Sequence, residues 1–176
     1  ETQKVTSVIT MPSELVLGFM YSLTDKLTLQ LDFQWTEWSK IKTWEFISEN
    51  TDEPGDSSQS MNFSWKDTLS FKLGAEFYLT DFIAFRAGYT NQQSSLSGDE
   101  LGPLLLDLDR NTVSFGFGYE GPMFDIFDTD RRSGEFSLDL FFQYVFSDNR
   151  TSSLFGIPVS YRGDHWMAGI GVGFNF

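Results

Sequence analysis

The stretch Trp166-Met-Ala-Gly-Ile-Gly-Val-Gly-Phe-Asn-Phe176 alternates two kinds of residue without interruption. Residues two apart share one face of a β-strand, so an apolar series from Trp166 to Phe176 lies on one face, and glycines with Met167 and Asn175 lie on the other. These faces, with an aromatic residue at the end, are typical of the closing strand of an outer-membrane β-barrel. The pattern also fits the last strand of a soluble β-sandwich.

Six earlier segments repeat this period of two, which indicates strands with two different faces. One face carries leucine, phenylalanine and other apolar residues, and the other carries glycine, hydroxyl, amide or charged residues. Each segment has about the length that a tilted strand needs to cross a bilayer, about ten residues. The six segments are residues 15–23, 27–35, 69–79, 83–89, 113–119 and 136–146. With the last stretch they predict an all-β fold, an antiparallel transmembrane β-barrel wall of seven strands.

The charged residues of these segments lie on the face opposite the phenylalanines. They are Asp32, Lys72, Glu76, Arg86 and Asp139. A barrel accommodates both faces, because lipid covers the apolar one and a polar lumen receives the charges. A soluble β-sandwich binding module would instead pack the phenylalanine-rich faces against each other in a dry centre. We favour the barrel, and the packing of these faces decides between the two.

The composition narrows the function further. The chain has 19 phenylalanines in 176 residues and still a slightly negative mean hydropathy of −0.22, which suits a barrel with a polar interior. A net charge of −13 argues against nucleic acid as a partner. A single histidine and no cysteine leave little material for a metal cluster or a catalytic triad. We therefore expect no enzyme, no metal and no cofactor.

The connections between the predicted strands differ in length. Residues 24–26 and 80–82 are tight turns of similar sequence. Long polar connections occupy residues 39–65, 91–111, 120–134 and 147–165. Barrels have short periplasmic turns and long external loops, so a periplasmic C-terminus places every long connection except 120–134 outside.

Seven strands place the start of the first strand on the external side, whereas bacterial barrels have an even number of strands. Two explanations remain open. Residues 1–12 supply an eighth strand, and the chain is a complete small barrel with a structural or adhesion role. Alternatively, the chain is the C-terminal half of a larger barrel.

Several motifs occur in a suggestive order along the chain. Residues 11–21, Met-Pro-Ser-Glu-Leu-Val-Leu-Gly-Phe-Met-Tyr, precede a strand that ends Phe33-Gln-Trp-Thr-Glu-Trp-Ser-Lys40. Asp107-Leu-Asp-Arg110 comes just before the fifth strand. This ordered set resembles the FadL-type outer-membrane transporters of long-chain fatty acids and other hydrophobic compounds, over essentially the whole chain.

The resemblance implies a 14-stranded barrel in the outer membrane of a Gram-negative-type bacterium, with residues 1–176 as its C-terminal half and last seven strands. It also implies passive transport of long-chain fatty acids or other hydrophobic small molecules. The expected partners are outer-membrane lipid and lipopolysaccharide, a hydrophobic ligand, and the N-terminal half of the same barrel.

Two cations on the predicted lumen face are candidate ligand contacts. Lys72 and Arg86 could attract the carboxylate of a fatty acid inside the lumen. The alternative for Arg86, which the strand register favours, is a cross-strand ion pair with Glu76 that satisfies both charges.

Five tryptophans lie near the external ends of the predicted strands. They are Trp35, Trp38, Trp44, Trp65 and Trp166. We interpret them mainly as an aromatic girdle at the lipid headgroups. The alternative is an aromatic platform for a hydrophobic ligand.

Overall fold

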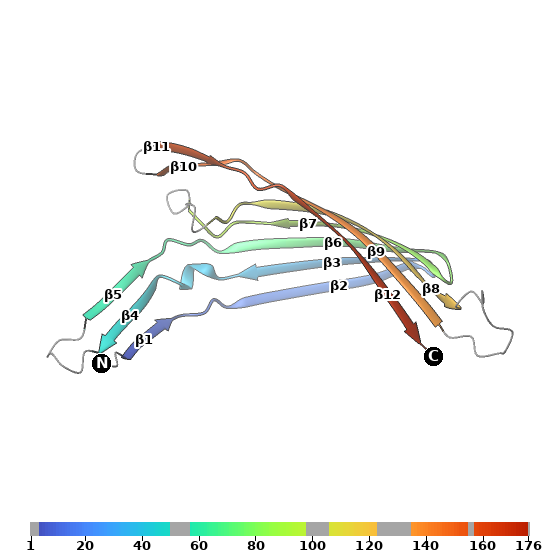
Figure 1. Cartoon of the computed structure of the whole chain (residues 1–176), viewed down its shortest axis with the longest axis horizontal. Coiled ribbons are helices and arrows are strands. Elements are labelled where there is room, and N and C mark those ends of the chain that lie inside the picture. The colour runs from blue at the N-terminus through green and yellow to red at the C-terminus, as the bar shows by residue number, and fades with distance from the viewer. Residues whose placement is uncertain (1–3, 50–56, 98–105, 123–134, 155–156, 176) are drawn as a thin grey trace.

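The computed structural model describes residues 4–49, 57–97, 106–122, 135–154 and 157–175. Its main element is a seven-stranded sheet in the order β12-β9-β8-β7-β6-β3-β2, in which every neighbouring pair is antiparallel (Figure 1). All seven predicted strands are confirmed. Their bounds are β2 (Glu14–Thr24), β3 (Leu27–Thr36), β6 (Thr68–Thr80), β7 (Ile83–Gln92), β8 (Arg110–Pro122), β9 (Glu135–Ser147) and β12 (His165–Asn175).

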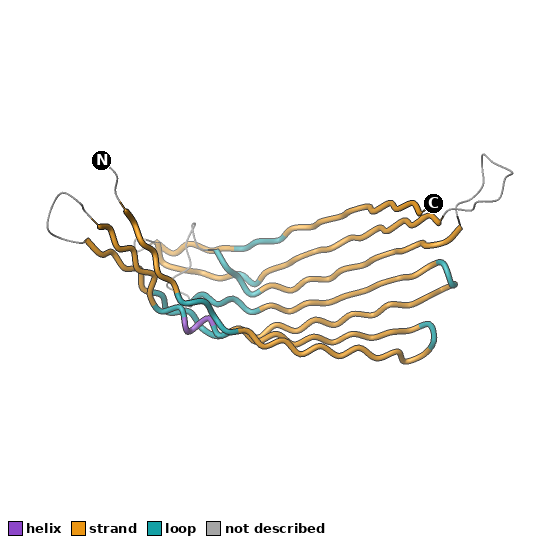
Figure 2. The backbone as a smooth tube through the Cα atoms, turned by 90° about the horizontal axis from the view of Figure 1, so that it is seen from below, coloured by secondary structure: helices purple, strands orange, loops and turns teal. Residues whose placement is uncertain are grey.

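The sheet is strongly twisted. In Figure 1, β2, β3 and β6 run nearly along the horizontal axis, whereas β9 and β12 cross the view steeply. Figure 2 shows the same strands from below, with the tight turns gathered at one end. Right-handed twist accumulates across neighbouring strands and is the geometry from which barrel walls are built.

The two faces of this sheet are chemically different, as the period of two predicts. Directly opposed residues share a face, and one such row runs through Asp32, Lys72, Thr90 and Thr112. We call this side the polar face and the other side the apolar face. On the apolar face, Phe19 is 61% exposed, Phe115 is 60% exposed and Ile170 is 70% exposed.

No phenylalanine-rich faces pack against each other in the part of the chain that is described. The buried apolar residues there are few, namely Ile41, Ala84, Leu96, Leu108 and Val145. A contiguous apolar surface of this extent must be covered by something other than water. The observed arrangement therefore excludes the β-sandwich and fits a wall with lipid on one side.

Smaller elements gather at the end of the sheet opposite the two tight turns, which we call the loop end (Figure 1). A three-stranded sheet pairs β4 with both β1 and β5, and β10 pairs with β11. Their bounds are β1 (Lys4–Ile9), the 3-10 helix η1 (Trp38–Lys40), β4 (Thr43–Glu49), β5 (Ser57–Asn62), β10 (Arg150–Leu154) and β11 (Ile157–Tyr161). No helix within the described ranges is long and apolar enough to cross a bilayer.

The pairing of β1 corrects one sequence-based alternative. A complete eight-stranded barrel needs residues 1–12 to close the seven-stranded sheet. The structure instead pairs Lys4–Ile9 with β4, outside that sheet. Pro12 lies between β1 and β2, and a proline cannot donate a backbone hydrogen bond to a strand ladder.

The opposite end of the sheet, the turn end, contains the two tight turns. In each turn a threonine hydroxyl accepts two backbone N–H groups. Thr24 Oγ1 accepts from Lys26 and Leu27 at 3.2 and 3.0 Å, and Thr80 Oγ1 accepts from Phe82 and Ile83 at 3.2 and 3.1 Å. The repeated Leu-Thr-Asp sequence thus forms the same turn twice, because a threonine side chain can replace a backbone acceptor.

Candidate functional site

A cavity of about 540 Å³ opens on the polar face at the loop end of the sheet. Its floor comes from strands. Gln34, Ser70, Gln92 and Arg110 are opposed pairwise in one row across β3, β6, β7 and β8, and all four line the cavity. Lys72 lines it two residues further along β6 toward the turn end. Glu14 of β2 also lines the cavity, so the strands present amides, hydroxyls, two cations and one carboxylate to it.

Aromatic and aliphatic side chains line the same cavity. Trp38 from η1 and Trp65 from the β5–β6 connection meet edge to face, with ring centroids 5.6 Å apart. Phe63 packs on Trp65 with its ring centroid at 4.8 Å. Leu96 and Leu106 from the β7–β8 connection add aliphatic surface. Polar and apolar surfaces thus meet in one enclosure, which suits a ligand with both characters.

The tryptophans divide between the two predicted roles. Trp35 and Trp166 lie on the apolar face and are 38% and 68% exposed, which fits the girdle. Trp38 and Trp65 line the cavity instead, so the girdle prediction is wrong for them and the ligand-platform alternative describes their position. Trp44 belongs to β4, where its Nε1 donates to Ser7 Oγ at 2.5 Å.

Lys72 is a cation without an ion-pair partner among the described residues. Asp32 is directly opposite on β3 in the register, yet the two side chains form no ion pair. The lysine side chain is exposed within the polar face. An anionic ligand group in the cavity could therefore bind this ammonium without displacing an existing partner.

Arg86, in contrast to Lys72, has two ion-pair partners. Its Nε donates to Glu76 Oε2 at 2.6 Å, so the predicted cross-strand ion pair is confirmed, and its Nη1 donates to Asp139 Oδ1 at 3.1 Å. Arg86 lines two smaller recesses on the polar face and does not line the cavity with Lys72. The structure therefore does not bring the two predicted ligand contacts together.

The second cation of the cavity is Arg110, which sequence reasoning missed. Its Nη2 lies 3.8 Å from Asp107 Oδ1, and its Nε is buried without a hydrogen-bond partner in the described parts of the chain. The sequence does contain a signal that places Arg110 on the polar face. Arg110, Thr112 and Ser114 continue the polar series of the fifth predicted strand at a period of two. Trp65 Nε1 is a second buried donor of this kind at the cavity wall.

Hydrogen bonds outside the sheet hold η1 in place. The backbone N–H of Ser39 donates to Asp67 Oδ1 at 3.0 Å. Hydrogen bonding from the Ser39 side chain, and then from its backbone, lowers the pKa of Asp67. This contact fixes η1 against the residues that follow Trp65, and so it fixes the Trp38–Trp65 pair.

A second carboxylate at the loop end is held in the same way. Arg162 Nε donates to Asp164 Oδ2 at 2.7 Å, and this hydrogen bond is the main reason that the pKa of Asp164 is lowered. Among the described residues, no three His, Asp or Glu side chains gather as metal ligands would. The absence of metals and cofactors remains a prediction.

Known proteins resemble the chain over nearly its whole length. A family model described as "Outer membrane protein transport protein (OMPP1/FadL/TodX)" matches residues 1–175. The 47 kDa outer membrane protein of Pasteurella multocida is 24% identical over 167 residues, which cover 94% of this chain and 35% of the relative. Outer membrane protein P1 of Haemophilus influenzae is 26% identical over 112 residues, which cover 64% of this chain and 23% of the relative.

A solved structure shows the same fold. A crystal structure of a Pseudomonas aeruginosa FadL homologue matches with a TM-score of 0.63 and 21% identity, over 93% of this chain and 34% of that one. The chain thus spans about a quarter to a third of the length of the relatives it matches. The chain belongs to the OMPP1/FadL/TodX family of outer membrane transport proteins, and it is a protein of the Gram-negative outer membrane.

Proposed function

We propose that this chain forms part of an outer-membrane channel for passive uptake of hydrophobic small molecules, with long-chain fatty acids as its preferred class. The observation that carries the proposal is the cavity itself. It combines Trp38, Trp65 and Leu96 with the ammonium of Lys72, which forms no ion pair with any described residue, on the polar face. An amphiphile with an apolar body and one carboxylate satisfies both surfaces.

The binding free energy of such a ligand has two contributions, from burial of its apolar body and from its carboxylate. Each methylene group removed from water contributes about 0.8 kcal/mol. A carboxylate on an exposed ammonium contributes only about 0.2–1 kcal/mol. The apolar body therefore supplies most of the affinity, and Lys72 selects the head group. Transfer along the lumen then needs no covalent chemistry.

Lys72 is the proposed carboxylate contact, with Arg110 beside it in the cavity. Arg86 was the second candidate from the sequence. Its guanidinium already donates to two carboxylates, so a ligand would have to compete with Glu76 and Asp139. We therefore assign Arg86 to the wall of the channel.

The edges of the seven-stranded sheet indicate how the barrel could close. Because all neighbouring strands are antiparallel, β2 and β12 at the two edges run in the same direction. Strands that pair antiparallel with both edges must be odd in number. We propose that residues 1–176 are the C-terminal half of a 14-stranded barrel and that its N-terminal half supplies seven strands. A second copy of this chain would place β2 beside β12 in parallel, which a membrane barrel of this type does not use.

Uptake by living cells tests this function. A host strain that lacks the gene is complemented with the natural protein and supplied with radiolabelled oleate or its uncharged analogue, oleyl alcohol. The protein should restore uptake of both. Lys72→Met should reduce oleate uptake by about fivefold and leave oleyl alcohol uptake unchanged. The matched control is Lys26→Met, in the first tight turn. Uptake that never exceeds that of the uncomplemented strain contradicts the proposal.

A further inference from the structure

Two parts of the β7–β8 connection are folded tightly onto each other at the loop end. Ser94 is fully buried, and its backbone N–H donates to Asp109 Oδ1 at 2.7 Å. Its hydroxyl donates to the carbonyl oxygen of Asp107 at 2.7 Å. The next amide, that of Ser95, donates to Asp107 Oδ2 at 2.9 Å. Residues 94 and 95 are therefore held against residues 107 and 109 by hydrogen bonds, two of them charge-assisted.

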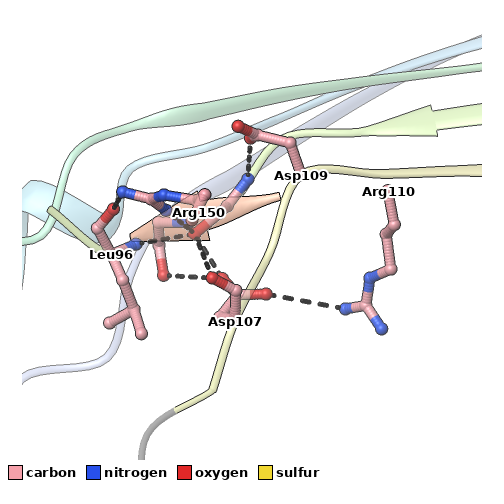
Figure 3. Close-up of polar contacts among 7 residues, drawn as sticks. Leu96, Asp107, Asp109, Arg110 and Arg150 are labelled. Atoms are coloured by element: carbon pink, nitrogen blue, oxygen red, sulfur yellow. Dashed lines mark hydrogen bonds and ion pairs between the residues drawn. The ribbon is translucent and has the colours of Figure 1, made fainter. Parts of the chain in front are cut away.

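A side chain from a different connection completes this cluster (Figure 3). Arg150, the first residue of β10, donates from Nη1 to Ser94 Oγ and from Nη2 to the carbonyl oxygen of Leu96, both at 3.0 Å. The two acceptors are 56 and 54 residues away in sequence. A guanidinium can hold two acceptors at once because its donors form a rigid planar fork, which an ammonium lacks.

The β7–β8 connection, to which Arg150 donates, also contributes residues to the cavity wall. Ser95, Leu96 and Asp107 all line the cavity that contains Lys72. Arg150 itself does not line it. Leu96 packs in a small apolar cluster with Leu108 and Trp65.

The β7–β8 connection is also attached to the β5–β6 connection, which carries Trp65. Lys66 N–H donates to the carbonyl oxygen of Ser95 at 2.9 Å, and Ser97 Oγ donates to that of Ser64 at 2.7 Å. Three connections that are far apart in sequence thus meet at one wall. The β10–β11 hairpin joins them through the hydrogen bonds of Arg150, and Tyr161 of β11 packs against the Leu96–Leu108 cluster.

We propose that Arg150 is a positioning residue that sets the dimensions of the apolar part of the cavity and thereby the affinity of the cavity for the apolar body of its ligand. It acts through Ser94 and Leu96 and does not touch the ligand. This inference rests on the proposed function, since it assumes that the cavity binds the transported compound. It assigns the β10–β11 hairpin a role in ligand affinity.

Binding measurements on the natural protein in detergent test the proposal. Dissociation constants for oleate and oleyl alcohol are measured for Arg150→Met and Arg150→Lys, with amide exchange at Ser94 and Ser95. Arg150→Met should weaken both ligands by about tenfold, with their ratio unchanged, because two charge-assisted hydrogen bonds are lost. Exchange at both amides should accelerate. Arg150→Lys should also weaken both ligands, because it cannot hold both acceptors.

Two further variants make the test specific. Arg162→Met removes another arginine of the loop end, one that pairs with Asp164, and it should leave both dissociation constants unchanged. Ser94→Ala leaves Arg150 in place but removes the hydroxyl that accepts from Arg150 Nη1 and donates to the carbonyl oxygen of Asp107. It should weaken both ligands by about threefold, so it replaces Arg150→Met if that variant does not fold.

Three results would overturn the proposal, and they are distinguishable. Dissociation constants of the Arg150 variants within twofold of the parent refute the positioning role. A selective loss of oleate, as expected for Lys72→Met, would make Arg150 a direct head-group contact. If the parent binds neither oleate nor oleyl alcohol, the proposed function fails first and this inference fails with it.

Discussion

Arg86 on β7 reaches Asp139 on β9 across the intervening strand β8, with Nη1 at 3.1 Å from Oδ1. The strand between them presents Gly118 at the crossing point. A Cβ atom there would lie 2.9 Å from Arg86 Nη1 and 3.2 Å from Asp139 Oδ1. The glycine therefore provides the space through which the guanidinium passes.

Gly118→Val should break this ion pair and destabilise the folded barrel. Because Arg86 and Asp139 are both partly exposed, we expect a loss of only about 1 kcal/mol, measured by urea unfolding of the natural protein in lipid vesicles. Combining the change with Asp139→Asn should add little, since both remove the same contact. The matched control is Gly74→Val, where the new Cβ would meet Gln30 at an ordinary 3.5 Å. Equal losses for the two glycine variants would refute this reason for Gly118.

A charge on the apolar face should be far more harmful than the same charge on the polar face. Phe115 and Ser114 are neighbours near the middle of β8 and lie on opposite faces. Phe115→Lys should destabilise the membrane-embedded protein by about 2–4 kcal/mol, the cost of a lysine facing lipid at the bilayer midplane. Ser114→Lys should have a much smaller effect. Equal destabilisation of the two variants in the same vesicles would contradict the assignment of faces.

Acid should release η1 from the β5–β6 connection. The pKa of Asp67 is lowered from 3.8 by hydrogen bonding from Ser39, so the carboxylate form is favoured in the folded protein. The contact contributes fully above pH 3.8 and is lost as the pH falls through the lowered pKa. The amide protection factor of Ser39, corrected for intrinsic exchange, should therefore fall in this range. Asp67→Ala should show the low value at all pH values, and a flat profile in the parent protein would refute the linkage.

A brominated fatty acid should quench the fluorescence of the cavity tryptophans. Trp38 and Trp65 line the cavity, whereas Trp166 lies on the apolar face. Trp65→Phe should remove a large part of the quenching that saturates with 9,10-dibromostearate, and Trp166→Phe should leave it intact. Saturable quenching that disappears only with Trp166→Phe would place the ligand among the lipids.

The sheet could be predicted from sequence because lipid and lumen impose opposite requirements on alternate residues. Every segment with a period of two became a strand of the main sheet, and Thr24 and Thr80 marked its tight turns. The pairing of Arg86 with Glu76 followed from the register alone. Strand β5 shows the limit, because Ser57-Ser-Gln-Ser-Met-Asn62 carries no apolar alternation, yet it pairs with β4 over its whole length.

The candidate site was predicted less completely, because its walls come from segments far apart in the sequence. Lys72 was identified from its position on the polar face. The cavity wall near Lys72 includes a connection that is bound by Arg150, more than 50 residues away in sequence. No local sequence pattern predicts such a contact. Trp38 and Trp65 were placed in the girdle because both lie near strand ends. Their real position depends on η1 and on the Ser39–Asp67 hydrogen bond.

The most direct test is to locate a fatty acid in crystals of the natural protein soaked with 9,10-dibromostearate, using the anomalous signal of bromine. The expected result is bromine between Trp38, Trp65 and Leu96, with the carboxylate at about 2.8 Å from Lys72 Nζ. Bromine found only on the apolar face, or a carboxylate bound to Arg86 in place of Lys72, would contradict the proposed site.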